Sequence, residues 1–210
     1  MIKFIYFDVG GVVIKDFSET NKWEDLKQEL GIPPDKSREF EDIYDSLQDE
    51  INTSLEIDSL LPIYKEKFNI TIPNGYSLLV DGFVKRFEKN LSIWPILEAA
   101  KTKFKIGLLT NMYPNMLTEI KNAKLLPNVD FDQIIDSSIE KVQKPYKAIY
   151  ELAENRSEFK AGKILFVDNS EKHLKTAKEF GWQTFFYDSS DYVESSKKLL
   201  ELINGLSRAK

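Results

Sequence analysis

Asp8 is the first residue of the sequence whose type and position suggest chemistry. It follows the apolar run 2–7 and precedes Gly10 and Gly11; glycines of this kind let a backbone turn tightly and approach a ligand. A carboxylate beside so apolar a segment must be hydrogen-bonded, paired or metal-bound, because an isolated buried charge is costly. A plain turn after a strand also favours aspartate, so the rest of the sequence has to decide between the two interpretations.

Three further motifs carry polar groups at comparable positions. Thr110 and Asn111 follow one apolar run, and Asp168 follows another. Lys144 stands directly before a proline, near the start of a predicted helix. Each motif alone has an ordinary explanation as a turn, a helix cap or a solvated lysine. Their order, each at the expected place in the chain, favours one shared site.

The chemistry that these groups suit best is phosphoryl transfer assisted by a metal ion. Asp8 and Asp168 on neighbouring strand ends would repel each other, and Mg²⁺, which prefers oxygen ligands, would remove that repulsion and attract a phosphate. Asp8 would keep one oxygen for attack on phosphorus, forming an acyl phosphate that water hydrolyses. The Thr110 hydroxyl and the Asn111 backbone N–H would bind phosphoryl oxygens, and Lys144 would supply a positive charge.

The elements expected to position these motifs alternate along the chain. Strands are predicted at 2–7, 105–109, 131–135, 163–167 and 183–187, and helices at 115–125, 147–154, 171–180 and 193–202. The stretch 16–91 instead carries apolar residues at helical spacing over 23–30, 38–48, 55–68 and 76–90. We therefore predict an α/β fold with a Rossmann-like parallel sheet, helices on both of its faces, and an inserted all-helical domain. Ligands of such sheets bind at the carboxyl ends of the strands.

Composition excludes several classes of protein. The 210 residues carry a net charge of −5, and no lysine- or arginine-rich stretch forms a basic face, which argues against nucleic-acid binding. The absence of cysteine excludes disulfides and thiolate metal sites. No apolar stretch approaches the roughly 18 residues that span a membrane, so no membrane contact and a cytoplasmic location are expected. Oligomeric state is not indicated.

Together, the motifs resemble the haloacid dehalogenase-like hydrolase superfamily. The resemblance is carried by Phe-Asp-Val-Gly-Gly-Val at 7–12, Leu-Thr-Asn at 109–111, Lys-Pro-Tyr-Lys-Ala-Ile-Tyr at 144–150 and Phe-Val-Asp-Asn-Ser at 166–170. Within this superfamily, the sequence is similar to the helical-cap branch that contains small sugar-phosphate phosphatases. That implies a Rossmann-like catalytic core over 1–15 and 92–210 and a helical cap domain over 16–91.

The resemblance implies a Mg²⁺-dependent phosphatase whose substrate is a small-molecule phosphate ester. Asp8 would be the nucleophile and a metal ligand, with Gly10 lending its backbone carbonyl and Asp168 completing the metal site. Lys144 would stabilise the phospho-aspartate. Thr110 and Asn111 would hold the phosphoryl group.

Three positions depart from the family pattern. Gly10 stands where most phosphatases of the family carry a general acid–base aspartate, and Asp16 is the candidate substitute. Asn169 stands where a second aspartate is common, which lowers the negative charge of the metal site. His173, the single histidine, is either a packing residue or a contact of the site.

Two other functions fit the same motifs. One is a 2-haloacid dehalogenase, since those enzymes also lack the second aspartate and need no metal. The other is a non-catalytic phosphate-binding relative, suggested by Gly10 and Asn169. The aromatic residues of 16–91 are interpreted mainly as that segment's own core, although one or two could face the cleft and select the substrate: Trp23, Phe40, Tyr44, Tyr64, Phe68, Tyr76, Phe83 and Phe87.

Overall fold

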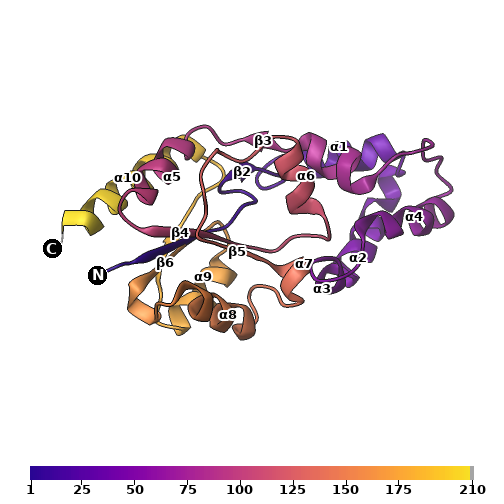
Figure 1. Cartoon of the computed structure of the whole chain (residues 1–210). Helices are drawn as coiled ribbons and strands as arrows, with labels where there is room; N and C mark the ends of the chain where they lie inside the picture. The colour runs from indigo at the N-terminus through magenta and orange to yellow at the C-terminus, as the bar shows by residue number, and fades with distance from the viewer. Residues whose placement is uncertain (209–210) are drawn as a thin grey trace.

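The computed structural model describes residues 1–208 and is built around a parallel sheet of five strands in the order β5-β4-β1-β6-β7 (Figure 1). The strands are β1 (Phe4–Phe7), β4 (Lys105–Thr110), β5 (Gln133–Asp136), β6 (Ile164–Asp168) and β7 (Gln183–Phe186). In the pairing register, Phe7 lies between Leu108 of β4 and Val167 of β6. The carboxyl ends of the three central strands are therefore side by side.

Helices cover both faces of this sheet (Figure 1). One face carries α5 (Trp94–Lys101), α6 (Met116–Asn122) and α10 (Tyr192–Arg208), and the other carries α8 (Lys147–Ser157) and α9 (Glu171–Glu179). The short helix α7 (Ser137–Glu140) follows β5. This arrangement confirms the predicted fold class. Residues 209 and 210, the end of the range expected for the core, lie outside the described residues.

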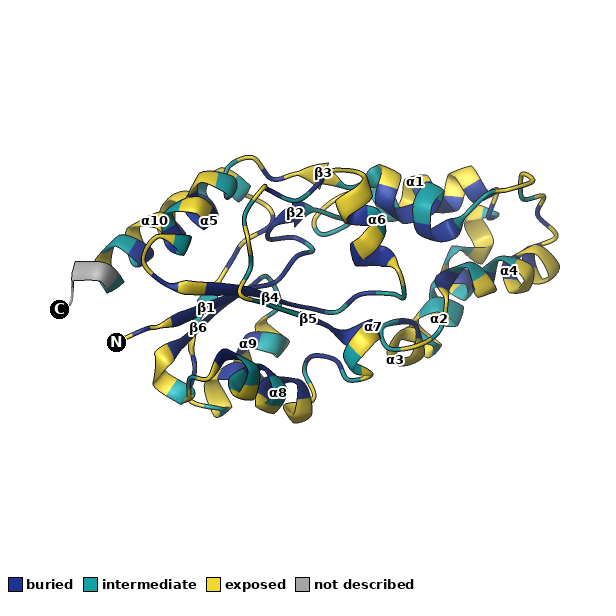
Figure 2. Cartoon of the chain, in the orientation of Figure 1, coloured by how far each residue is buried: buried dark blue, intermediate teal, exposed yellow. Residues whose placement is uncertain are grey.

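Successive residues of β1 supply two separate hydrophobic cores, because neighbouring side chains of a strand point to opposite faces. Ile5 and Phe7 belong to the core on the α5 and α10 side, whereas Phe4 and Tyr6 belong to the core under α8 and α9. All four are fully buried, as the dark strands of Figure 2 show. Burial of each such side chain stabilises the fold by about 1.5–3 kcal/mol, so the sheet is a rigid support for groups at its edge.

The inserted segment 16–91 contains α1 (Lys22–Leu30), α2 (Ser37–Ser46), α3 (Gln48–Ile51) and α4 (Leu60–Phe68), with 3-10 turns at Pro34–Lys36 and Ile57–Ser59. These helices group at the end of the molecule away from both termini (Figure 1). Gly31 ends α1 in a left-handed conformation at φ 76°, where glycine carries no penalty. Phe40 stacks on Tyr64 with ring centroids 4.3 Å apart, so part of the aromatic content does form the segment's own core. The division of the chain into catalytic core and cap stays a prediction.

In place of the single helix predicted over 76–90, the structure has two short helical turns and a strand. A π-helical turn (Leu78–Phe83) and a 3-10 turn (Val84–Arg86) are followed by β3 (Glu88–Lys89), which pairs antiparallel with β2 (Ile14–Lys15). Extended backbone is needed here because the chain returns from the insertion to the sheet. The Asn90 side chain reinforces this return by donating a hydrogen bond of 2.6 Å to the carbonyl of Val12.

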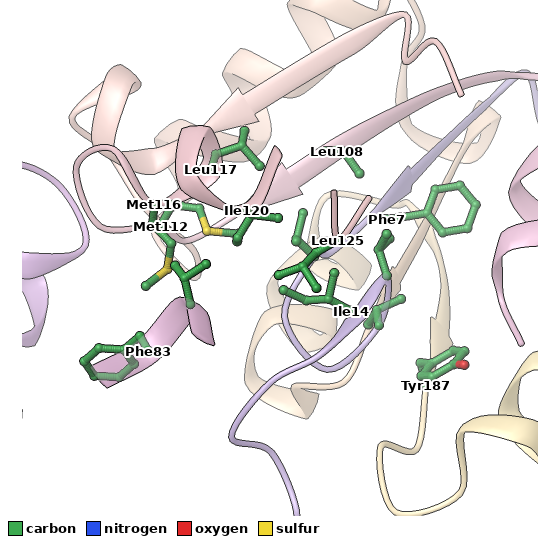
Figure 3. Packing of buried hydrophobic residues seen from close by; sticks show 14 of the residues in the cluster. Phe7, Ile14, Phe83, Leu108, Met112, Met116, Leu117, Ile120, Leu125 and Tyr187 are labelled. Atoms are coloured by element: carbon green, nitrogen blue, oxygen red, sulfur yellow. The ribbon is translucent and has the colours of Figure 1, made fainter. Parts of the chain in front are cut away.

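The insertion also packs on the core through apolar side chains. Phe83 of the insertion is buried in one cluster with Met112, from the loop after β4, and with Met116 and Ile120 of α6. Figure 3 shows these four side chains near one another. Among the described residues, the structure contains no helix with the length and apolar character needed to cross a membrane.

Candidate active site

The candidate site forms where the three central strands end. Asp8 comes directly after β1, Thr110 is the last residue of β4, and Asp168 is the last residue of β6. Lys144 arrives from the loop between α7 and α8. The parallel topology thus brings four groups from distant parts of the sequence to one edge of the sheet, as the ligand rule for such sheets predicts.

Lys144 bridges the two carboxylates. Its Nζ lies 2.9 Å from Oδ2 of Asp8 and 2.7 Å from Oδ2 of Asp168. The lysine is only 1% exposed, and its ammonium also lies 5.2 Å from the centre of the Phe166 ring. A buried charge of this kind is tolerated because it is paired on two sides, so one ammonium holds the two acids close together despite their repulsion.

The remaining carboxylate oxygens face backbone donors and the histidine. Oδ1 of Asp8 accepts the N–H of Val9 at 2.7 Å, and Oδ1 of Asp168 accepts the N–H of Ser170 at 2.7 Å. His173 Nδ1 lies 3.2 Å from Oδ1 and 3.1 Å from Oδ2 of Asp168, so the single histidine does contact the site. Ligand atoms of Asp8, Asp168 and His173 all lie within 4.8 Å of one another, which is a group that could hold a metal ion.

The two aspartates have opposite electrostatic environments. Burial raises the pKa of Asp8 to about 6, although Lys144 acts in the other direction. Burial would also raise the pKa of Asp168, but Lys144 and His173 outweigh it and bring this pKa down to about 2. Burial alone would lower the pKa of Lys144, whereas the carboxylates of Asp168 and Asp8 raise it. Asp168 and Lys144 therefore stay charged at neutral pH, and Asp8 is the group that protonates first.

Asn111 holds the backbone of the bridging lysine. Its Oδ1 accepts the N–H of Lys144 at 2.9 Å, and its Nδ2 donates to the carbonyl of Lys144 at 2.9 Å. The side chain is thereby committed to the lysine, which leaves the Asn111 backbone N–H as the group expected to bind a phosphoryl oxygen. Both bonds link residues 33 positions apart, so nothing local in the sequence signals them.

The Thr110 hydroxyl is buried, and none of the described residues is its hydrogen-bond partner. An unsatisfied buried hydroxyl is costly, which makes it a suitable donor for an anion. Thr110, Lys144 and Asp168 do not line the adjoining cavity, whereas Asp8, Gly10 and Asn111 do.

Asp16 occupies the space that Gly10 leaves open. A Cβ built on Gly10 would lie 2.5 Å from Oδ2 of Asp16, so this carboxylate stands where a side chain at position 10 would project. Its Oδ1 accepts the N–H of Ser18 at 2.9 Å, and burial raises its pKa. The structure thus brings the expected substitute acid to the cavity beside Asp8.

Asn169 supports the glycine turn. Its Nδ2 donates to the hydroxyls of Ser18 and Ser189 at 3.1 and 3.0 Å. Gly11 has φ 70°, and a Cβ there would lie 2.0 Å from this nitrogen, so no other residue fits the position. Asn169 thereby fixes the turn beside the acids rather than adding a charge to them.

A cavity of about 680 Å³ opens between the strand ends and the insertion. Its polar floor includes Asp8, Asn111 and His173. Six aromatic residues line its walls: Phe17, Trp23, Tyr44, Phe83, Phe87 and Tyr113. The hydroxyls of Tyr44, on the insertion, and Tyr113, on the core, are hydrogen-bonded. Tyr113 was not anticipated, although its position just after the Thr-Asn motif at a strand end was an available signal.

A family model of haloacid dehalogenase-like hydrolases matches residues 2–181 of the sequence. The chain belongs to this family. It is therefore a hydrolase, and the predicted membership of the haloacid dehalogenase-like superfamily is confirmed. No curated protein sequence matches it.

Several solved structures of haloacid dehalogenase-like proteins share the fold. A predicted HAD-like family hydrolase from Porphyromonas gingivalis is 20% identical with a TM-score of 0.74, and the match covers 95% of this chain and 98% of that one. A HAD family enzyme from Bacteroides thetaiotaomicron, in complex with magnesium and inorganic phosphate, is 19% identical with a TM-score of 0.71 and coverages of 91% and 96%. An L-2-haloacid dehalogenase from Xanthobacter autotrophicus, with chloropropionic acid covalently bound, is 19% identical with a TM-score of 0.61 and coverages of 88% and 76%. At these identities the likeness shows the fold alone.

Proposed function

We propose that this hydrolase is a Mg²⁺-dependent phosphatase that hydrolyses a small phosphorylated metabolite through a phospho-aspartate on Asp8. The observation that carries the proposal is the contact of Lys144 with both Asp8 and Asp168, next to a cavity. The Bacteroides relative, which binds magnesium and inorganic phosphate, adds support.

The donor set fits a hard cation. Asp8 and Asp168 offer carboxylate oxygens, the Gly10 carbonyl is the expected third protein ligand, and His173 lies within reach. Mg²⁺ held there would neutralise charge on the phosphoryl group and orient it for attack.

In the proposed reaction an Asp8 oxygen attacks phosphorus, a P–O bond to Asp8 forms, and the ester P–O bond breaks. The departing oxygen takes a proton from Asp16, which then accepts a proton from the water that hydrolyses the phospho-aspartate. This second step releases inorganic phosphate and restores the Asp8 carboxylate. Lys144 offsets the charge of the Asp8 carboxylate before attack and after hydrolysis and stabilises the phospho-aspartate between the two steps, and the Thr110 hydroxyl and Asn111 N–H bind the phosphoryl oxygens.

The segment 16–91 is proposed to act as a cap domain over this site. It supplies Trp23 and Tyr44 to the cavity wall. Asp49 of α3 attaches it to the core by accepting hydrogen bonds from Gln143 Nε2 at 2.6 Å and the Tyr146 hydroxyl at 2.7 Å. A cap held in this position would exclude water from the reacting phosphate.

The test is phosphate release from p-nitrophenyl phosphate by the purified protein. We expect activity with Mg²⁺, its loss in EDTA, and a fall in kcat of at least about 10³-fold in Asp8→Asn, because the nucleophile is gone. Asp35→Asn, which removes an exposed carboxylate outside the cavity, is the matched control. Unchanged turnover in Asp8→Asn would refute the mechanism.

A 2-haloacid dehalogenase is the second candidate, and one observation favours it. The ammonium of Lys144 contacts both Asp8 and Asp168, so part of the negative charge of the two acids is balanced without a metal ion. The Xanthobacter enzyme, a dehalogenase, shares the fold. Halide release from L-2-chloropropionate in EDTA, with no phosphatase activity, would decide for it. Binding of inorganic phosphate without turnover of any ester would instead indicate a non-catalytic relative.

A further inference from the structure

The aromatic residues on the cavity wall form a connected surface. Trp23 packs edge to face on Tyr44 with ring centroids 4.9 Å apart, and Phe83 does the same with Tyr113 at 5.3 Å. Phe17 joins the two pairs, since its ring lies 5.1 Å from Phe83 and 5.8 Å from Trp23. This wall faces the same cavity as Asp8. A leaving group bound against it would bury apolar or aromatic surface.

The charged side chains on this wall are all acidic. Asp45, Asp16 and Glu41 line the cavity, and none of its lining residues is lysine or arginine. Glu41 forms an ion pair with Lys27, whose Nζ lies 2.6 Å from Oε1 of Glu41. Neither Asp45 nor Asp16 has an ion-pair partner within the described part of the chain, residues 1–208.

The effect of these carboxylates reaches the aromatic wall. Burial is the main cause that raises the pKa of Tyr44 to about 12, and the negative charges of Asp45 and Asp16 add to it. Burial likewise raises the pKa of Tyr113, with Asp16 contributing. The leaving-group side of the cavity therefore has negative potential, which the Asp45 carboxylate maintains while Asp16 holds the proton that it is proposed to donate.

We infer that the substrate is a phosphate ester whose leaving alcohol is aromatic or otherwise apolar and carries a positively charged amine. The inference rests on the proposed phosphatase function and specifies its substrate class. Aromatic faces and the unpaired Asp45 carboxylate both attract a cation, whereas a second phosphate or a carboxylate on the leaving group would be repelled. No lysine or arginine lines the cavity to pair with such an anion.

The test compares three phenyl phosphates that differ only in a para substituent. The substituents are 2-aminoethyl, which is cationic, 2-hydroxyethyl, which is neutral, and 2-carboxyethyl, which is anionic. The three phenols have similar leaving-group strength, so differences in kcat/KM report recognition of charge. We expect the cationic ester to exceed the neutral ester by about fivefold to tenfold, and the anionic ester to fall below it by a similar factor.

Variants of an exposed wall residue locate the effect. Asp45→Asn should reduce the preference for the cationic over the neutral ester to about twofold, and Asp45→Lys should bring the anionic ester level with or above the cationic one. Phosphate release from p-nitrophenyl phosphate in each variant reports whether the reacting groups are intact, and the preference is measured as the ratio of kcat/KM values for two esters within one variant. Asp35→Asn serves as the carboxylate control outside the cavity and should keep the full preference.

Equal kcat/KM for the three esters, or preference for the anionic one, would overturn the inference. If p-nitrophenyl phosphate is still hydrolysed in an Asp8-dependent way, the proposed function survives that result. A preference that is unaffected by Asp45→Lys would also refute the assignment to this wall. Loss of all phosphatase activity, p-nitrophenyl phosphate included, would refute the function and the inference together.

Discussion

Replacing Asp8 by asparagine is predicted to stabilise the metal-free protein while it abolishes activity. Burial raises the pKa of Asp8 from 3.8 to about 6, so the native state holds an ionised carboxylate at neutral pH at a cost. One pKa unit corresponds to about 1.4 kcal/mol, which puts this cost at about 3 kcal/mol above pH 7. Asparagine removes the charge and keeps an oxygen for the Val9 N–H that now donates to Oδ1.

The stability gain of Asp8→Asn is expected to depend on pH. Because the native-state pKa is raised, the native state binds a proton more tightly than the unfolded chain does, and the cost of ionisation disappears as pH falls through 6 toward 4. The stability difference between Asp8→Asn and the wild type should therefore be near zero at pH 4 and about 3 kcal/mol at pH 7.5.

Urea unfolding in EDTA, followed by the fluorescence of the three tryptophans, measures this difference. Adding Mg²⁺ should stabilise the wild type more than the variant and narrow the gap, since the ion loses a ligand in Asp8→Asn. Asp45→Asn, which removes an exposed carboxylate, should change stability by less than about 0.5 kcal/mol. A variant that is less stable than the wild type at pH 7.5, or a gap that does not change with pH, would refute the reasoning about Asp8.

Two further outcomes follow from the same site. Asp16→Asn should lower kcat about 10²-fold or more on an alkyl phosphate but only a few-fold on p-nitrophenyl phosphate, because the nitrophenolate leaving group needs no proton. Phosphate release measures both rates. An equal fall in kcat on the two substrates would contradict the role of Asp16 as general acid. Thr110→Val should raise the stability of the phosphate-free protein by about 1–2 kcal/mol, because it removes a buried hydroxyl without a partner, and should weaken stabilisation by inorganic phosphate in thermal unfolding. A Thr110→Val protein that is destabilised and still binds phosphate normally would argue against that assignment.

The sheet and the meeting of Asp8, Thr110 and Asp168 could be predicted because they depend on local information. Short apolar runs indicate the strands, and the segments between them have the periodicity of helices. The carboxyl ends of parallel strands necessarily share one edge of the sheet. The motif order then placed Lys144 nearby. The catalytic roles of these residues remain predictions, whereas the contacts of Lys144 with Asp8 and Asp168 are observed.

Features that depend on contacts between distant segments could not be predicted. The side chain of Asn111 is committed to the backbone of Lys144, a partner that only the folded loop supplies, whereas the role predicted for the Asn111 backbone N–H stays a prediction. The periodicity of 76–90 indicated a helix, but pairing of β3 with β2 requires extended backbone there. The position of Asp45 on the cavity wall follows from how α2 packs over the core, which no local pattern in the sequence encodes.

The hydrogen bonds of Asp49 have a consequence for how substrate would enter and phosphate would leave. Gln143 and Tyr146, the two residues that α3 binds through Asp49, lie on either side of Lys144 in the chain. Any swing of α3 away from the sheet must break these bonds and so remove two supports of the loop that carries the ammonium. Entry of substrate and exit of phosphate would thus be coupled to the position of the Lys144 ammonium. The ammonium would lie against Asp8 when α3 is hydrogen-bonded to the loop.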